Sequence, residues 1–233
     1  MCTTEIYENE QIDDLLCGGL KILQKKDAFR YGTDAVLLSD FARVPKGGIV
    51  LDIGTGTGIL PILLSAKTEA SSFVGIDIQE DMVRLAERSV CMNGLAERIS
   101  VRHMDVNDLP VHYPKRSFDC IVTNPPYKRA GSGLLNDTHG VTVARHEITC
   151  TLDDILRVSG DMLKVGGSFN MVCRPERLAD TFESMRKYRL EPKVLTMVHS
   201  YADREPVLFL VHAIAFGGKN LQVTAPILLG SGS

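Results

Sequence analysis

The sequence predicts an α/β fold in which a mostly parallel sheet of seven strands has an antiparallel last strand and helices on both faces. Three observations favour it. Apolar runs of strand length alternate with segments of helical periodicity along most of the chain. A glycine turn at 54–58 joins one of these runs to a helix. Two apolar strands near the carboxyl terminus follow each other with no helix between them, so they should pair antiparallel.

Composition and charge limit the class of protein. The chain has 233 residues, 44% of them hydrophobic, and can bury one substantial core. It has no apolar run of about 18 residues and no signal peptide at its start, so we expect a cytoplasmic protein without a membrane span. The net charge of −3 does not favour nucleic-acid binding through a broadly basic surface. The oligomeric state is left open.

The chain divides into three parts by composition. We expect a hairpin extension over residues 1–28, one α/β domain over 29–229, and a Gly-Ser tail without a role over 230–233. In the extension, apolar segments at 12–16 and 20–23 flank a Cys-Gly-Gly turn, which is typical of a hairpin.

Cysteines and histidines give no sign of a metal site. The six cysteines show no paired spacing, so we expect neither zinc nor a disulfide framework, and thiols that are reduced and mostly in the core. Five histidines are not at metal-ligand spacing either: His103, His112, His146, His199 and His212.

A helix with one apolar stripe is predicted to begin after the loop at 29–34. Thr33 and Asp34 are candidates for its N-cap, because both side chains can accept a hydrogen bond from the first turn. A second helix, apolar nearly all round, is predicted at 59–66, as expected for a helix buried against a sheet. Pro61 is tolerated there because it lies in the first turn.

The stretch Asp52-Ile-Gly54-Thr-Gly56-Thr-Gly58 reads as the end of a strand, a turn and the start of that helix. Glycines at alternate positions remove the Cβ atoms, so the backbone can take positive φ and approach a ligand closely. The first N–H groups of the helix then face this ligand. A dinucleotide fingerprint would have its third glycine one position later, so another nucleoside ligand is favoured.

Acidic residues follow the next two strands. The apolar run 73–76 ends in Asp77, which lies 23 residues after Gly54, a separation typical of an acid that binds both hydroxyls of a ribose. A helix is predicted from Glu80 until Gly94 ends it. The third strand, 99–104, is followed by Asp105.

Asn124-Pro125-Pro126-Tyr127 follows the fourth strand, 118–122, whose apolar composition suits a central parallel strand. Ligands bind at this end of open α/β sheets. The prolines hold the Asn124 side chain and the Pro125 carbonyl rigidly. These acceptors can take both hydrogens of a conjugated amino group and free its lone pair for attack. Tyr127 offers a face for stacking a planar base, worth about 1 to 3 kcal/mol. Because positioning does most of the work, no nucleophilic side chain is needed.

The remaining elements are predicted from periodicity alone. We expect a helix at 152–163, a strand at 168–173 and a helix at 175–188. The antiparallel strands follow at 194–198 and 207–216.

The glycine turn with Asp52 and Asp77 resembles the S-adenosyl-L-methionine (SAM) site of Rossmann-like class I methyltransferases. This resemblance implies SAM as cofactor and a SAM-dependent methyltransferase domain over 29–229. It implies that Asp105 holds the adenine amino group of SAM; alternatively, Asp105 caps residues 106–108. The loop before the first helix is expected either at the methionine end of SAM or only as a cap. The residues implied to bind SAM are Gly32, Thr33, Asp34, Asp52, Gly54, Gly56, Gly58, Asp77, Ile78, Asp105, Val106 and Asn124.

Asn124 to Tyr127 resembles the motif of amino-methyltransferases that act on adenine N6, cytosine N4 or the glutamine amide of release factors. With the loop at 29–34 and the compact length, residues 12–229 resemble the family that methylates N6 of adenine 37 in valine tRNA. We expect no room for the helical domain of the release-factor enzymes or for a separate DNA-recognition region. No cysteine follows a proline, which argues against methylation of a pyrimidine carbon.

The resemblance implies RNA, in particular tRNA, as the partner. Two alternatives stay open: a protein glutamine methyltransferase acting on release factors, and a SAM-binding RNA adaptor without turnover. Four basic residues near the motif are candidates for RNA contact or for solvated surface charges: Lys128, Arg129, Arg145 and Arg174. We expect Arg186, Lys187 and Arg189 to complement a helix C-terminus instead.

Overall fold

The computed structural model describes residues 5–26, 32–125 and 150–230. Strands and helices alternate through most of this length, and short 3₁₀ turns at Val106–Asp108 and Pro175–Arg177 precede two of the helices. The elements are β1 (Glu10–Asp14), β2 (Lys21–Lys25), α1 (Thr33–Phe41), β3 (Ile49–Ile53), α2 (Ile59–Lys67), β4 (Ser72–Asp77), α3 (Glu80–Met92), β5 (Ile99–His103), α4 (Leu109–His112), β6 (Phe118–Thr123), α5 (Leu152–Met162), β7 (Leu163–Cys173), α6 (Leu178–Lys187), β8 (Leu190–His199), β9 (Pro206–Ala215), β10 (Gln222–Val223) and β11 (Ile227–Leu228).

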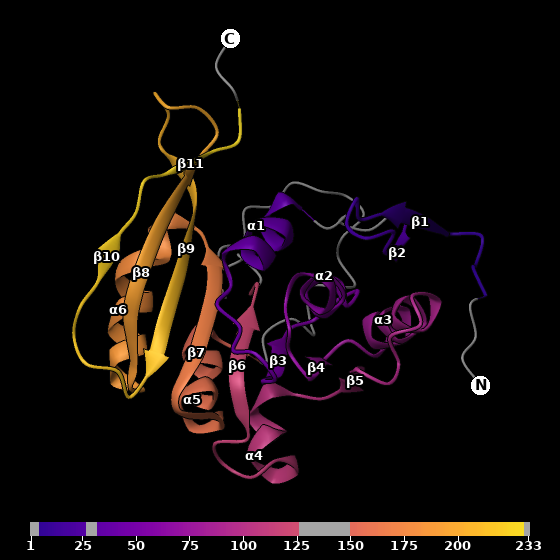
Figure 1. Ribbon diagram of the computed structural model, residues 1–233, viewed down its shortest axis with the longest axis horizontal. Coiled ribbons are helices and arrows are strands. Elements are labelled where there is room, and N and C mark those ends of the chain that lie inside the picture. The colour runs from indigo at the N-terminus through magenta and orange to yellow at the C-terminus, as the bar shows by residue number, and fades with distance from the viewer. Residues whose placement is uncertain (1–4, 27–31, 126–149, 231–233) are drawn as a thin grey trace, which may run out of the picture.

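The central sheet confirms the predicted α/β fold (Figure 1). Its strand order is β10-β8-β9-β7-β6-β3-β4-β5, with β11 also paired to β8. The five strands from β7 to β5 are parallel, and β9 runs antiparallel between β7 and β8. The seven predicted strands are therefore present. Sequence reasoning missed β10 and β11, which have two residues each and are too short for a periodic signal.

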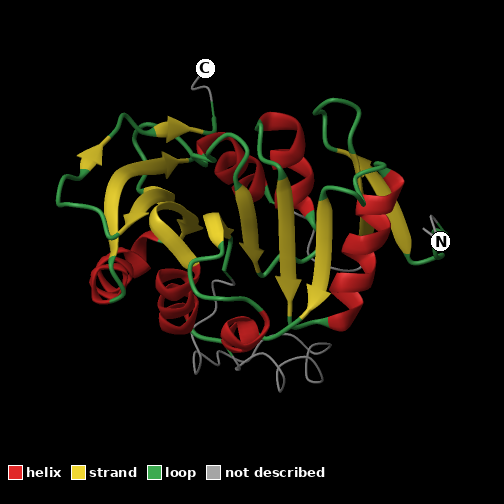
Figure 2. Ribbon diagram, turned by 60° about the horizontal axis from the view of Figure 1, so that its bottom comes forward, coloured by secondary structure: helices red, strands yellow, loops and turns green. Residues whose placement is uncertain are grey.

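Helices cover both faces of this sheet (Figure 2). Neighbouring residues of β3 show why, because Val50 packs with α1 and α2 in one apolar cluster and Leu51 packs with α4, α5 and α6 in the other. α2 lies deep, with seven of its nine residues buried, as its all-round apolar composition predicts. The central strand β6 is buried at five of its six positions. The carboxyl ends of β3, β4 and β6 thus form a rigid edge.

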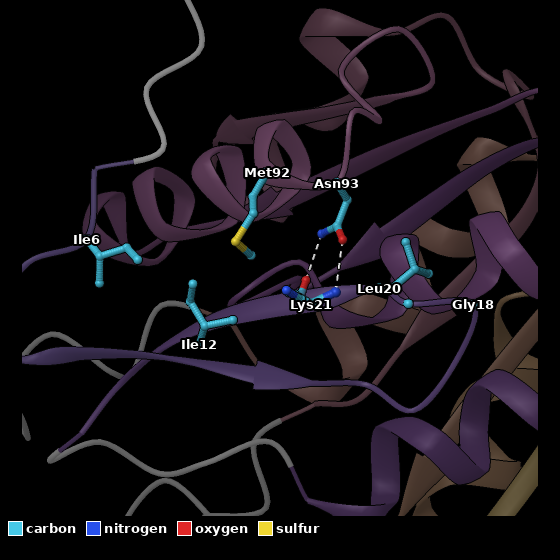
Figure 3. Close-up of a pocket in the computed structure, with 8 residues that line it drawn as sticks. Ile6, Ile12, Gly18, Leu20, Lys21, Met92 and Asn93 are labelled. Atoms are coloured by element: carbon cyan, nitrogen blue, oxygen red, sulfur yellow. Dashed lines mark hydrogen bonds between the residues drawn. The ribbon is translucent and has the colours of Figure 1, made fainter.

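The predicted N-terminal hairpin is confirmed and is attached to α3 (Figure 3). The Asn93 side chain bonds both the N–H and the carbonyl of Lys21, at 2.9 and 2.7 Å. The Leu23 N–H donates to the Ser89 hydroxyl at 3.0 Å. A concavity of about 610 Å³ lies between the hairpin and the end of α3. Gly94, with φ of 67°, follows the helix at the predicted position.

A buried polar cluster fastens the segment after α1 to the sheet. The Asn170 side chain accepts the Arg43 N–H at 3.1 Å, and the Ser168 hydroxyl donates to the Arg43 carbonyl at 2.6 Å. His212 lies against Asn170, with 3.1 Å between Nδ1 and Oδ1. Burial lowers the pKa of His212 to about 4, so this histidine is neutral in the folded protein near neutral pH. The cluster anchors α1 through the main chain that follows it.

Three local predictions were wrong. Gly32 is the N-cap of α1, whereas Thr33 is already helical, and within the described residues no side-chain hydrogen bond caps this helix. The strand predicted at 168–173 begins at Leu163, because Leu163 already pairs with Phe118 of β6, and a bulge at 164–167 separates this pair from the regular pairing that starts at Ser168. Cys91 on α3 is in a disulfide bond, a pairing that cysteine spacing did not indicate. The other described cysteines are free: Cys17, Cys120, Cys150 and Cys173.

Residues 5–26, 32–125 and 150–230 contain no candidate membrane span and no candidate metal cluster. There, no helix is both long and apolar enough to cross a membrane. Over the same ranges, no cluster of three or more histidine, cysteine or acidic residues could hold a metal ion.

Candidate cofactor and active site

The turn between β3 and α2 leaves space for a ligand at two of its glycines. Gly54, Gly56 and Gly58 have φ of 74°, 52° and 81°, values that side chains rarely adopt. A Cβ on Gly54 or Gly56 would meet no atom within 4 Å, so both face open space. A Cβ on Gly58 would lie 3.1 Å from the Cβ of Ala86. The first two glycines therefore leave room for a ligand, and the third allows α2 to pack on α3.

Asp77 holds the turn in place from the end of β4. Its carboxylate accepts the Gly56 N–H at 2.8 Å and the Gln79 N–H at 2.9 Å. Burial raises the pKa of Asp77, and these backbone donors oppose the shift. Each oxygen keeps a lone pair for a further donor. The same carboxylate can therefore orient the turn and accept hydroxyl groups of a ligand.

Asp52 at the end of β3 is a buried carboxylate without a hydrogen-bond partner. It is 1% exposed, and neither oxygen forms a hydrogen bond with the residues that the structure describes. Burial raises its pKa to about 7; the Thr55 hydroxyl lies close without reaching hydrogen-bond geometry and partly opposes the shift, and the negative charge of Asp77 adds to it. An orphaned carboxylate is costly unless a ligand supplies positive charge or donors.

These residues fit SAM. SAM carries a positively charged sulfonium and an ammonium group, and Asp52 is an unpaired acid beside the open turn. SAM also carries a ribose, and Asp77 lies one strand away, since Ile53 pairs with Ile76. The donor set therefore matches both the charge and the hydroxyl groups of the cofactor.

Asn124 lies beside the glycine turn. β3 and β6 are adjacent and parallel, about 5 Å apart, with Ile53 opposite Thr123, so Gly54 and Asn124 directly follow the paired ends of neighbouring strands. The Thr123 hydroxyl donates to the Ile53 carbonyl at 2.9 Å and ties the two strand ends together. Asn124 is half-buried and Pro125 is buried. The other predicted residues of this region lie outside the described residues: Pro126, Tyr127, Lys128, Arg129 and Arg145.

Asp105 caps the turn that follows β5, which is the alternative that the sequence left open. One of its oxygens accepts the main-chain and side-chain N–H groups of Asn107, at 2.9 and 3.0 Å. Arg157 on α5 in turn donates to the Asn107 side chain at 2.5 Å. Sequence reasoning missed Asn107, although an Asp-x-Asn spacing after a strand is a signal for such a turn. The second Asp105 oxygen is not used in this cap.

The other predicted residues lie at the following places. Ile78 is 41% exposed directly after Asp77, whereas Val106 is buried. Arg174 follows the carboxyl end of β7, beside β6, and donates to the Val207 carbonyl at 3.4 Å. Gly32, Thr33 and Asp34 begin α1, and their contact with SAM stays a prediction.

Similarity to known proteins shows to which class of protein this site belongs. Residues 50–129 match the family model described as a methyltransferase domain. A predicted O-methyltransferase from Agrobacterium tumefaciens superposes with a TM-score of 0.67 at 22% identity, covering 84% of this chain and 86% of that one. A geranyl diphosphate methyltransferase in complex with SAM superposes with a TM-score of 0.58 at 15% identity, covering 78% and 84%. The fold and the site define a class I, SAM-dependent methyltransferase.

Relatives in sequence narrow the class. A protein of Parabacteroides distasonis is 31% identical over 191 residues, covering 82% of this chain and 78% of the relative. One of Porphyromonas gingivalis is 29% identical over 209 residues, covering 87% and 78%. Both are named tRNA1(Val) (adenine(37)-N6)-methyltransferase. The chain belongs to this family.

Replacing Asp77 by alanine should raise the Kd for SAM by at least about tenfold. A charge-assisted hydrogen bond contributes about 1.5 to 3 kcal/mol, and this variant also releases the Gly56 N–H. Titration calorimetry with SAM measures the change. Asp81→Ala is the matched control, because that acid is exposed on α3 and pairs with Lys25. Equal affinity in Asp77→Ala and the wild type would show that Asp77 does not contact the cofactor.

Proposed function

We propose that this chain transfers the methyl group of SAM to the exocyclic N6 amino group of an adenine in structured RNA, with adenine 37 of valine tRNA as the substrate. The observation that carries the proposal is the position of Asn124 one strand away from the open glycine turn. In this position, the Asn124 amide oxygen and the Pro125 carbonyl can hold a substrate amino group close to the methyl group of SAM bound at the turn. The names of the relatives supply the tRNA position.

In this proposal, Asn124 and the Pro125 carbonyl accept the two hydrogens of the adenine amino group. These bonds hold the nitrogen in line with the methyl group and favour a pyramidal nitrogen with a free lone pair. Tyr127 stacks on the base. Positioning supplies most of the acceleration, which is consistent with a site built from acceptors.

The cofactor supplies an electrophilic methyl group, and the chain's own residues bind and orient it. We assign Asp52 to its positive charge, Asp77 to its ribose and the open faces of Gly54 and Gly56 to its main body. The exposed side chain of Ile78 is suited to cover the adenine ring. The unused Asp105 oxygen can accept from the adenine amino group while the other oxygen caps the turn. The remaining assignments follow the resemblance: Gly32, Thr33, Asp34, Gly58, Val106 and Asn124 for SAM, and Lys128, Arg129, Arg145 and Arg174 for RNA.

Transfer of labelled methyl from SAM tests the substrate. Total tRNA, total rRNA and a release factor are offered separately, and labelled RNA is digested to nucleosides. We expect label in tRNA as N6-methyladenosine, absent from tRNA of a cell in which adenine 37 of valine tRNA is replaced. Label only in the release factor would move the acceptor to a glutamine amide, and no label in any substrate would favour the adaptor without turnover.

A further inference from the structure

A concavity at the opposite edge of the sheet gathers positive charge. It measures about 360 Å³ and lies where α5 and α6 end and β6 and β8 begin. Although the chain carries a net charge of −3, Asp161 is the one acid among the described residues that line this concavity. Five cations line it: Lys115, Arg116, Arg157, Lys187 and Arg189.

Three of these cations are neutralised by neighbours. Lys115 pairs with Asp161, and Lys187 pairs with Asp153. Arg157 pairs with Asp154 and also bonds Asn107. These three cations therefore already have acidic partners within the protein.

Arg116 and Arg189 are different. Both are exposed, and neither guanidinium forms an ion pair or hydrogen bond within the part of the chain that the structure describes. Each lies 5.3 Å from the centre of the Phe216 ring, which is itself 36% exposed. Two planar cations on one aromatic ring keep all their N–H donors available. The two guanidinium groups are therefore free to donate hydrogen bonds to the oxygens of a phosphate group.

The backbone at these three residues is strained. Arg116, Arg189 and Phe216 have φ of 63°, 62° and 60°, and among the described residues they are three of the four non-glycine residues with positive φ. Arg189 occupies the position after α6 where glycine is the common choice. Its main-chain carbonyl accepts the Phe216 N–H at 2.7 Å. Strain of this kind collects at binding sites, because the side chain is retained for a purpose other than stability.

The site lies far from the point of methyl transfer. Arg116 precedes β6 and Asn124 follows it, and β6 alone spans about 17 Å from Phe118 to Thr123 at about 3.3 Å per residue. A ligand that reaches both must be an extended polyanion. A folded RNA meets this condition, because its phosphates repeat along the whole molecule.

We propose that Arg116, Arg189 and Phe216 form a second RNA contact that binds the phosphate backbone of the substrate away from the target adenine. This inference rests on the proposed RNA substrate. The two guanidinium groups bind phosphate oxygens, and the Phe216 ring holds both of them side by side. The contact gives affinity without reading sequence. Arg189 thus has a role other than the one expected at a helix C-terminus.

The test measures binding of full-length tRNA and of a short hairpin that carries only the target loop. We expect the double variant Arg116→Gln/Arg189→Gln to bind tRNA at least about tenfold more weakly, and the slope of log K against log salt to fall by about 2. The KM for tRNA should rise while kcat and the methylation of the short hairpin stay unchanged. Arg116→Lys/Arg189→Lys should keep most of the salt slope. Arg84→Gln, an exposed arginine paired with Glu80, is the matched control and should behave as wild type.

The melting temperature of the double glutamine variant is measured to exclude a folding defect. It should equal that of the wild type, since glutamine leaves the backbone strain unchanged. Arg189→Gly relieves the strain at one position and should melt at an equal or higher temperature while binding tRNA more weakly. Equal tRNA affinity and salt slope in the double variant and the wild type would overturn the second contact, as would an equal loss on the short hairpin. Wild-type protein that methylates no RNA would contradict the proposed function instead, whatever the variants bind.

Discussion

Replacing Asn124 by alanine should lower kcat by at least about 100-fold and leave the Kd for SAM within about twofold of wild type. The variant removes one of the two acceptors that we assign to the substrate amino group. Loss of one positioned group in an enclosed site commonly costs 10²- to 10³-fold in kcat. The glycine turn, Asp52 and Asp77 are unchanged, so the cofactor keeps its main contacts. Single-turnover methyl transfer to tRNA and titration with SAM measure the two quantities separately.

Asn93→Ala is the matched control for this experiment. That amide bonds the hairpin to α3, away from the strand ends that meet SAM. We expect its kcat to stay at the wild-type value. If Asn124→Ala kept wild-type turnover, the assigned mechanism would be wrong, and if it lost SAM binding equally, Asn124 would be a cofactor residue alone.

At pH 8, replacing Asp52 by asparagine should make the cofactor-free protein more stable than the wild type. At pH 5, this gain in unfolding free energy should be smaller. The pKa of Asp52 is about 7 in the folded protein and about 3.8 when unfolded, so between these values the folded state binds more protons. Wild-type stability is therefore lost as pH rises from about 4 to about 7. Asparagine does not ionise. Between pH 5 and pH 8 the difference in unfolding free energy should change by about 3 kcal/mol.

Urea unfolding of both proteins across this pH range measures the effect. His212 acts in the opposite direction, because its pKa is lowered to about 4, and a buried neutral histidine loses stability as pH falls below about 6.5. Subtracting one protein from the other removes this contribution. A stability difference that does not vary with pH would show that Asp52 is not a buried, unpartnered carboxylate.

The same variant should bind SAM more weakly, since the positive charge of the cofactor loses its acid. In the wild type, SAM affinity should rise with pH up to about 7, because binding requires the ionised carboxylate. The ionised form of Asp52 therefore destabilises the cofactor-free protein but favours the binding of SAM. Titration calorimetry in buffers of different ionisation enthalpy would detect the proton that leaves Asp52 on binding.

Most of the fold could be predicted because each element carries a local signal. The all-round apolar composition of α2, the antiparallel pair β8 and β9, and Gly94 after α3 all follow from short-range chemistry. The errors have one local and one non-local cause. The cap of α1 is Gly32, a residue without a capping side chain, and β10 and β11 depend on pairing with β8 for their conformation.

The candidate site could be predicted in part. Asp77 was identified by its separation from Gly54, and its bond to the Gly56 N–H explains that separation, since the acid holds the turn. Asn107 was missed although its Asp-x-Asn spacing is a local signal, and its contact with Arg157 of α5 could not be predicted because it joins two segments far apart in sequence. The contact of Arg116, Arg189 and Phe216 was missed for the same reason, since three segments far apart in sequence converge there.

The sequence by itself determined the strand-turn-helix at 52–58, the acid at the end of the next strand and the Asn124-Pro125 step that follows β6. Glycine, proline and apolar periodicity act over a few residues, so their effect can be read without the fold. Only the tertiary structure decided that Asn124 lies one strand from Gly54. It also decided that, among the described residues, Asp52 is buried without a partner and Arg116 and Arg189 form no ion pair. Strand order, burial and ion pairing depend on residues brought together from distant positions in the sequence. They therefore cannot be predicted from a local sequence pattern.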